Sequence, residues 1–160
     1  MNTPLKTLLI VAHTPSSNTR ILAESILKGA QNNIIQSVKT ELVSPFDCDS
    51  EKVLASDAVI LFTTENFGYM SGALKDFFER IYYPCLDDPK RNQATPFALV
   101  IRAGLDGTGA KMSVKKIIKG LHWREAQATT ICKGAYNKRF EDDCHEVGLT
   151  IAASLEAGII

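Results

Sequence analysis

The 160-residue sequence lacks several features that would assign it to a specialised class of protein. Its net charge is zero, because 18 basic residues balance 18 acidic ones. This balance argues against a general nucleic-acid surface and against an acidic electron carrier that finds its partners by charge steering. No apolar run approaches membrane-spanning length, and no secretion signal is recognisable. We therefore expect a cytoplasmic protein that binds neither nucleic acid nor membrane.

The cysteines lack the spacing of a metal site or of a redox pair. Cys48, Cys85, Cys132 and Cys144 form no C-x-x-C motif, and the Cys144–His145 pair lacks the further ligands that a metal needs. Without a secretion signal, four reduced thiols are expected. A G-x-S-x-G elbow is also missing, and no Ser-His-Asp set can be placed. We therefore assign no metal ligand and no catalytic residue.

The composition is that of an ordinary folded protein. Apolar residues make up 45% of the chain and charged residues 22%, so disorder is not expected. A chain of 160 residues can enclose a sizeable core within one domain. No internal repeat, low-complexity tract or linker interrupts it. We expect residues 1–160 to form a single domain.

Short apolar runs alternate with segments whose apolar residues recur at helical spacing. The pattern predicts strands over residues 8–12, 38–43, 58–63, 97–102 and 125–133. It predicts helices over 21–30, 50–56, 73–83, 112–121 and 140–155, and a polar loop over 87–95. This alternation implies a three-layer α/β fold in which helices cover both faces of a five-stranded parallel sheet. We expect the doubly wound strand order 2-1-3-4-5.

Three loops rich in polar residues or glycine follow predicted strands 1, 3 and 4. They comprise residues 13–19, 63–72 and 103–109. In the order 2-1-3-4-5 the carboxyl ends of these three strands are neighbours, and ligands of open α/β sheets bind at that edge. The loops are therefore expected to form one crevice for a flat ligand.

The first loop has the composition of an anion site. It offers hydroxyl groups, the Asn18 amide and the N–H groups of a helix start, and no Asp or Glu occurs between Thr7 and Ala23. Arg20 near the helix start is unfavourable unless an anion offsets it. Plain helix capping by Ser16, Ser17 or Asn18 is an equally good interpretation. His13 fits a satisfied polar residue at a strand end better than a catalyst.

The second loop offers aromatic side chains and a backbone that a planar ring can approach closely. Phe67 and Tyr69 flank Gly68, and Gly72 follows. The alternative interpretation places Phe67 and Tyr69 in the core and makes Ser71 a helix N-cap.

The third loop nearly matches a nucleotide P-loop. Gly104 and Gly109 fit G-x-x-x-x-G, but the next residues are Ala110, Lys111 and Met112, so the required lysine is displaced by one position. Nucleoside-triphosphate binding is therefore rejected, which leaves close packing against a ring edge or a flexible turn. The lysines that follow at helical spacing are interpreted as a solvated face rather than as partners of NADPH phosphates; they are Lys111, Lys115, Lys116 and Lys119.

Two of these loops carry motifs of a known family. Residues 14–19 resemble the phosphate loop S-x-x-x-x-N-T, and residues 65–75 resemble a flavin loop that runs into M-S-G-x-L-K. The sequence thus resembles the flavodoxin-like FMN-binding proteins, and especially their NAD(P)H-dependent FMN and quinone reductase branch.

The resemblance implies one noncovalently bound FMN. By position, its phosphate would be held by Ser16, Ser17, Asn18 and Thr19. Its ring would be bordered on one side by Glu65, Asn66, Phe67, Gly68 and Tyr69, and on the other by Ala103, Gly104, Gly107 and Gly109. The flanking residues His13, Thr14 and Thr64 complete the candidate cofactor-binding set, and His13 and Tyr69 are also candidates for substrate contact.

The activity that the resemblance implies is electron transfer from NAD(P)H to a quinone, a flavin or a similar small-molecule acceptor, in a homodimer or tetramer. Three alternatives remain open. The first is a flavodoxin-type electron carrier that does not itself turn over NAD(P)H. The second is a signalling receiver domain, although the acids it needs are replaced by Ala12-His13 and Thr63-Thr64. The third is a binding module that has lost the flavin.

Overall fold

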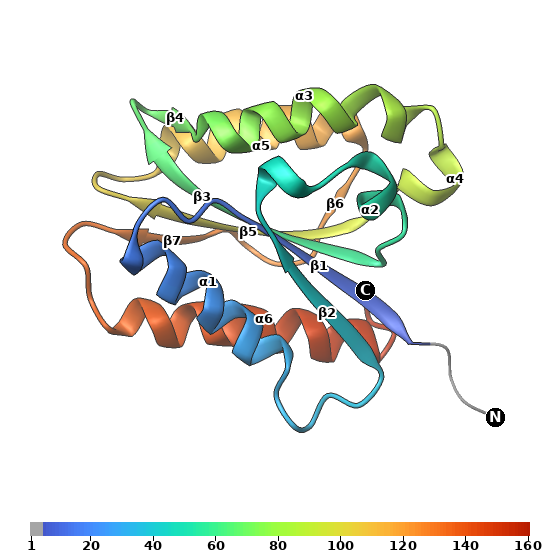
Figure 1. The fold of residues 1–160 in the computed structure, drawn as a ribbon, viewed down its shortest axis with the longest axis horizontal. Helices are drawn as coiled ribbons and strands as arrows, with labels where there is room; N and C mark the ends of the chain where they lie inside the picture. The colour runs from blue at the N-terminus through green and yellow to red at the C-terminus, as the bar shows by residue number, and fades with distance from the viewer. Residues whose placement is uncertain (1–4) are drawn as a thin grey trace.

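A parallel β-sheet with helices on both faces makes up residues 5–160, the part of the chain that this computed structural model describes (Figure 1). Residues 1–4 lie outside the described residues, and the expectation that no secretion signal is present falls partly on them. The strands are β1 (Lys6–Ala12), β2 (Val38–Val43), β3 (Ala58–Asn66), β4 (Tyr69–Met70), β5 (Pro96–Ala103), β6 (Arg124–Glu125) and β7 (Thr130–Lys133). The helices are α1 (Ser17–Ala30), α2 (Ser50–Leu54), α3 (Gly72–Leu86), α4 (Pro89–Asn92), α5 (Thr108–Leu121) and α6 (Arg139–Glu156), with the 3₁₀ turn η1 (Pro45–Asp47).

The strand order confirms the doubly wound topology expected from the sequence. The sheet runs β2-β1-β3-β5-β6, with β7 also paired to β5, and these pairings are all parallel. Among the strands within residues 5–160, β4 alone is antiparallel, and it forms a hairpin with the end of β3. The three-layer flavodoxin-like α/β prediction is therefore correct.

The prediction of a single strand over residues 125–133 is wrong in one respect, because the structure has two short strands there, β6 and β7. β6 pairs with the start of β5 and β7 with its end. After Ala126, whose N–H still donates to the Phe97 carbonyl at 2.8 Å, the chain leaves the ladder. The intervening residues 126–129 include two alanines, which have little preference for a strand.

Two apolar clusters separate the sheet from its helices. Helices α1 and α6 cover one face of the sheet, and α3 and α5 cover the other, together with α2 (Figure 1). Strands β1, β3 and β5 lie at the centre, and most of their side chains are buried. Helices α1 and α6 pack so closely that a Cβ on Gly148 would overlap the Ile26 carbonyl oxygen. No helix within residues 5–160 has the length and apolar character needed to cross a membrane.

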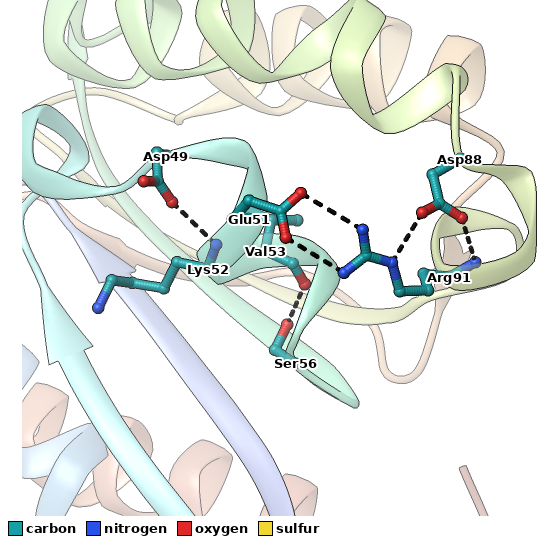
Figure 2. A network of polar contacts seen from close by, with 7 residues as sticks. All are labelled: Asp49, Glu51, Lys52, Val53, Ser56, Asp88 and Arg91. Carbon is teal, nitrogen blue, oxygen red and sulfur yellow. Dashed lines mark hydrogen bonds and ion pairs between the residues drawn. The ribbon is translucent and has the colours of Figure 1, made fainter.

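The predicted loop over 87–95 instead contains the short helix α4. Asp88 caps it by accepting from the Arg91 N–H at 3.2 Å, and Pro89 occupies the first turn, so a start signal was present in the sequence. Figure 2 shows Arg91 reaching across to Glu51 of α2, with N–O distances of 3.2 and 3.3 Å. Hydrogen bonds from Arg91 lower the pKa of Asp88. These contacts fasten α4 to α2, far from the β3–β4 hairpin (Figure 1).

Candidate functional site

The three loops singled out from the sequence lie at one edge of the sheet. The register aligns Ala12 of β1 with Phe62 of β3, and Phe62 with Val100 of β5. The carboxyl ends of these neighbouring strands therefore open into the first, second and third loops. This is the edge where the strand order reverses and where sheets of this type bind ligands.

The first loop begins α1 through a reciprocal cap. The Ser16 hydroxyl accepts from the Thr19 N–H at 3.2 Å, and the Thr19 hydroxyl accepts from the Ser16 N–H at 3.0 Å. The helix therefore uses both side chains internally, and Thr19 is buried. Capping by Ser16, one of the two interpretations of this loop, is thus observed.

The cap leaves backbone donors open at the start of α1. Within residues 5–160, the N–H groups of Ser17 and Asn18 have no acceptor, and both side chains are exposed. The first turn contains no acid, so the helix dipole there is not offset by a carboxylate. An anion would satisfy these donors, and capping and anion binding are therefore compatible in this loop.

His13 and Thr14 flank this open helix start. The His13 N–H donates to the Phe62 carbonyl at 3.0 Å, which ties the loop to β3. Partial burial lowers the pKa of the His13 imidazole below its usual value, because burial disfavours the charged ring. Thr14 and Arg20 line a small cavity of about 130 Å³ between the loop and β2.

The second loop is a tight hairpin rather than an open turn. Glu65 pairs with Met70 and Asn66 with Tyr69, and the turn consists of Phe67 and Gly68, with φ angles of 53° and 69°. The Phe67 side chain is fully exposed and Tyr69 is partly exposed, so the interpretation of both as core residues is wrong.

The other part of that interpretation is correct, because Ser71 is the N-cap of α3. Its hydroxyl accepts from the Leu74 N–H at 3.1 Å. It also hydrogen-bonds the buried Thr63 hydroxyl at 3.1 Å, which joins the start of α3 to β3.

Replacing Phe67 by asparagine is expected to stabilise the protein. A phenylalanine at φ 53° is strained, whereas asparagine tolerates the left-handed region, so the unfolding free energy should rise by about 0.5–1 kcal/mol. Urea denaturation measures the change. Phe46→Asn is the matched control, because Phe46 is also exposed but has no positive φ, and it should give no gain. A Phe67→Asn protein no more stable than the parent would contradict a strained turn.

Glu65 joins the second loop to the third. Its two carboxylate oxygens accept from the N–H groups of Gly107 and Ala110, both at 3.3 Å. Helix α5 has no side-chain cap at its own N-cap residue, Gly107, so Glu65 supplies one from across the crevice. A carboxylate at a helix N-terminus is also favoured by the helix dipole.

Backbone packing strengthens the same junction. A Cβ on Gly109 would overlap the Gly68 carbonyl oxygen, so only glycine permits this approach of α5 to the hairpin. The Met70 N–H donates to the Ser113 hydroxyl at 3.2 Å. Gly107 has a φ of 74° and forms the turn into α5. Gly107 and Gly109 thus hold the crevice wall in place.

The base of the third loop is held by Arg102, which belongs to no motif recognised in the sequence. Its guanidinium donates to the carbonyls of Ala103, Cys132 and Gly134, and it lies over the Phe140 ring with its central carbon 5.4 Å from the ring centroid. Ala103 is buried in the apolar cluster beneath α3 and α5, whereas Gly104 is exposed with open space at its Cβ position. The sequence feature that could have identified this residue is an arginine near the end of an otherwise apolar strand.

A buried hydroxyl without a partner marks the centre of the edge. The Thr64 Oγ1 atom is shielded from solvent and finds no hydrogen-bond partner in the part of the chain that the structure describes. Buried polar atoms are normally paired, but Thr40 and Thr129 also carry buried hydroxyl oxygens without a partner among the described residues, so this feature is not specific to the crevice. The candidate residues fall into three groups. Within the protein, bonding or packing involves Ser16, Thr19, Glu65, Ala103, Gly107 and Gly109, and the exposed residues are Ser17, Asn18, Asn66, Phe67, Gly68, Tyr69 and Gly104. The remaining candidates, His13, Thr14 and Thr64, are partly buried.

The comparisons with known proteins agree with this geometry. A family model described as NADPH-dependent FMN reductase matches residues 49–137. A comparison with curated proteins returned no match. A flavodoxin from the domain Archaea is 16% identical, with a TM-score of 0.75 over 94% of this chain and 99% of that chain. Flavodoxin from Megasphaera elsdenii is 16% identical, with a TM-score of 0.73 over 91% and 98%. The apo form of an NADH:FMN oxidoreductase is 11% identical, with a TM-score of 0.70 over 93% and 89%. At these identities the structural likeness shows the flavodoxin-like fold.

Proposed function

The chain belongs to the NADPH-dependent FMN reductase family, and from this premise we propose that it binds one FMN at the carboxyl edge of the sheet. It passes electrons from NAD(P)H to a quinone, a flavin or a similar small-molecule acceptor. The proposal treats residues 1–160 as one domain. A cytoplasmic location and a dimeric or tetrameric state remain predictions.

The observation that carries the proposal is the open start of α1. A phosphate monoester there would accept from the free N–H groups of Ser17 and Asn18 and contact their side chains. Ser16 and Thr19 fix the backbone so that these donors point outward. Thr14 and Arg20, together with Glu24, line the small cavity between this loop and β2.

The hairpin and the third loop supply the residues that would border the isoalloxazine ring. Within residues 5–160 the N–H groups of Phe67, Gly68, Gly104 and Leu105 have no acceptor, so they are available to ring nitrogens and carbonyls. Gly104 has open space on its Cβ side, which permits close approach of a flat ligand. The residues present therefore fit FMN.

FMN, when bound, accepts a hydride from a reduced nicotinamide and returns the electrons to an acceptor. The work of the protein is then to hold and orient. The α1 start fixes the phosphate, and the Glu65 bridge keeps the two ring-bordering loops at a constant separation. The exposed Phe67 and Tyr69 leave the site open to a second planar molecule.

Anaerobic stopped-flow mixing of the FMN-loaded protein with NADPH, and separately with NADH, tests this activity. We expect the flavin absorbance to be lost on a turnover timescale with at least one of them, and to return when a quinone is added. Free FMN at the same concentration is the control. Loss no faster than that of free FMN would favour the flavodoxin-type electron carrier, a function that the structural likeness to flavodoxins also supports.

A further inference from the structure

Arg102, near the end of β5, is a partly buried cation that no carboxylate neutralises. Within residues 5–160 it is the one arginine that is not exposed, and it forms no ion pair there. Its guanidinium instead meets three backbone carbonyls and the ring of Phe140. Charged groups that leave water are usually paired, because burial without a counterion costs free energy. An unpaired cation kept at this position indicates that its charge has a use.

The brace on the third loop explains the hydrogen bonds of Arg102 but not its charge. Carbonyl oxygens need N–H donors, and a neutral amide group supplies donors without the cost of burying a cation. A carboxylate beside the guanidinium would reduce that cost. Glu141, the residue after Phe140, accepts from the Tyr136 hydroxyl at 3.0 Å and forms no ion pair with Arg102. The positive charge is therefore left free to act on a ligand.

The strand register places this charge at the edge where the three loops meet. Arg102 lies opposite Thr64 of β3 and Cys132 of β7, one residue before the third loop. Alternate side chains of a strand share a face of the sheet, and Val100 belongs to the apolar cluster under α1 and α6. Arg102 therefore lies on the same face as the open start of α1, at the edge where FMN is proposed to bind.

We propose that Arg102 raises the redox potential of bound FMN. The inference rests on the proposed function, because it requires FMN at this edge. A hydride from NAD(P)H brings two electrons and one proton to the ring and leaves NAD(P)⁺, so the ring gains one negative charge. A fixed cation beside the ring stabilises that charge, and reduced FMN then binds more tightly, relative to oxidised FMN, than it would without the cation.

The midpoint potential of the FMN-loaded protein, measured against a reference dye, tests this role. The dissociation constant of oxidised FMN is measured in parallel by fluorescence quenching. Arg102→Gln removes the charge and should weaken binding of reduced FMN about tenfold more than binding of oxidised FMN, which lowers the two-electron potential by about 30 mV. Loss of the brace alone would weaken binding of both forms alike and leave the potential unchanged.

Two further variants separate the charge from the hydrogen bonds. Arg102→Lys keeps the charge but cannot reproduce the planar fork of donors, so it should weaken both forms of FMN alike and keep the parent potential. Arg124→Gln is the matched control, because Arg124 is exposed, forms no ion pair in the described part of the chain and lies on β6, beside the start of β5. It should change neither the affinity nor the potential.

A parent potential in Arg102→Gln, or a potential lowered equally by Arg102→Lys, would overturn the inference and leave Arg102 a structural role alone. If Arg102→Gln does not fold, the potential of Arg102→Lys decides, and a lowered value counts against the inference. Titration of the parent protein with oxidised FMN separates this failure from that of the proposed function. If FMN binds and the variants share one potential, only the role of Arg102 is wrong.

Discussion

Gly109→Ala is expected to raise the dissociation constant for FMN about tenfold or more, the equivalent of about 1.4 kcal/mol. Position 109 lies in the first turn of α5, where alanine alone would favour the helix by about 1 kcal/mol. The added Cβ would, however, overlap the Gly68 carbonyl oxygen, and that atom belongs to backbone that cannot rotate away. The hairpin must therefore shift relative to the third loop, and the N–H groups proposed to meet the ring shift with it.

Flavin fluorescence quenching measures the affinity, and urea denaturation of the same samples measures stability. Gly72→Ala is the matched control, since it also lies in the first turn of a helix but has nothing within 4 Å of its Cβ position. This control should bind FMN like the parent. Unchanged affinity in Gly109→Ala would show that the junction between the hairpin and α5 does not shape the site.

Glu65→Gln is expected to lower the unfolding free energy by about 1–3 kcal/mol and to weaken FMN binding as well. The carboxylate accepts from two N–H groups, those of Gly107 and Ala110. A glutamine amide keeps the size but replaces one acceptor by a donor, which leaves one of those N–H groups facing an N–H. It also removes the negative charge from the start of α5.

Hydrogen exchange at the Gly107 and Ala110 amides separates loss of the cap from a general loss of stability. A general loss would increase exchange throughout the protein, and not at these two amides in particular. Both amides should lose protection in Glu65→Gln. Glu146→Gln on α6, an exposed glutamate outside the crevice, should leave them unchanged. Equal exchange in the two variants would mean that Glu65 does not cap α5.

The sequence predicted the fold well because the signals for it are local. Buried central strands require continuous apolar runs, and β1, β3 and β5 have them. Predictions from weaker sequence patterns were wrong where contacts between distant segments decide the structure. β6 and β7 separate although they had been predicted as one strand, and β3 extends to Asn66 because β4 pairs with it.

The candidate site was predictable in position but not in detail. The loops that follow the first, third and fourth predicted strands, which are β1, β3 and β5 of the structure, must meet once the strand order is known. They do meet at one edge of the sheet. The bridge from Glu65 to Gly107 spans 42 residues in sequence, so no local pattern announces it. The turn at Phe67 was missed because phenylalanine is a poor residue for the left-handed region.

A ¹⁵N spectrum of the protein, recorded during titration with FMN, tests the central claim most directly because it reports affinity and location together. The account predicts saturation at one FMN per chain, with the largest shifts at the amides of Ser17, Asn18, Gly68 and Gly104, whose N–H groups are free in the structure. A spectrum that does not change, or one whose shifts avoid the start of α1, would contradict it.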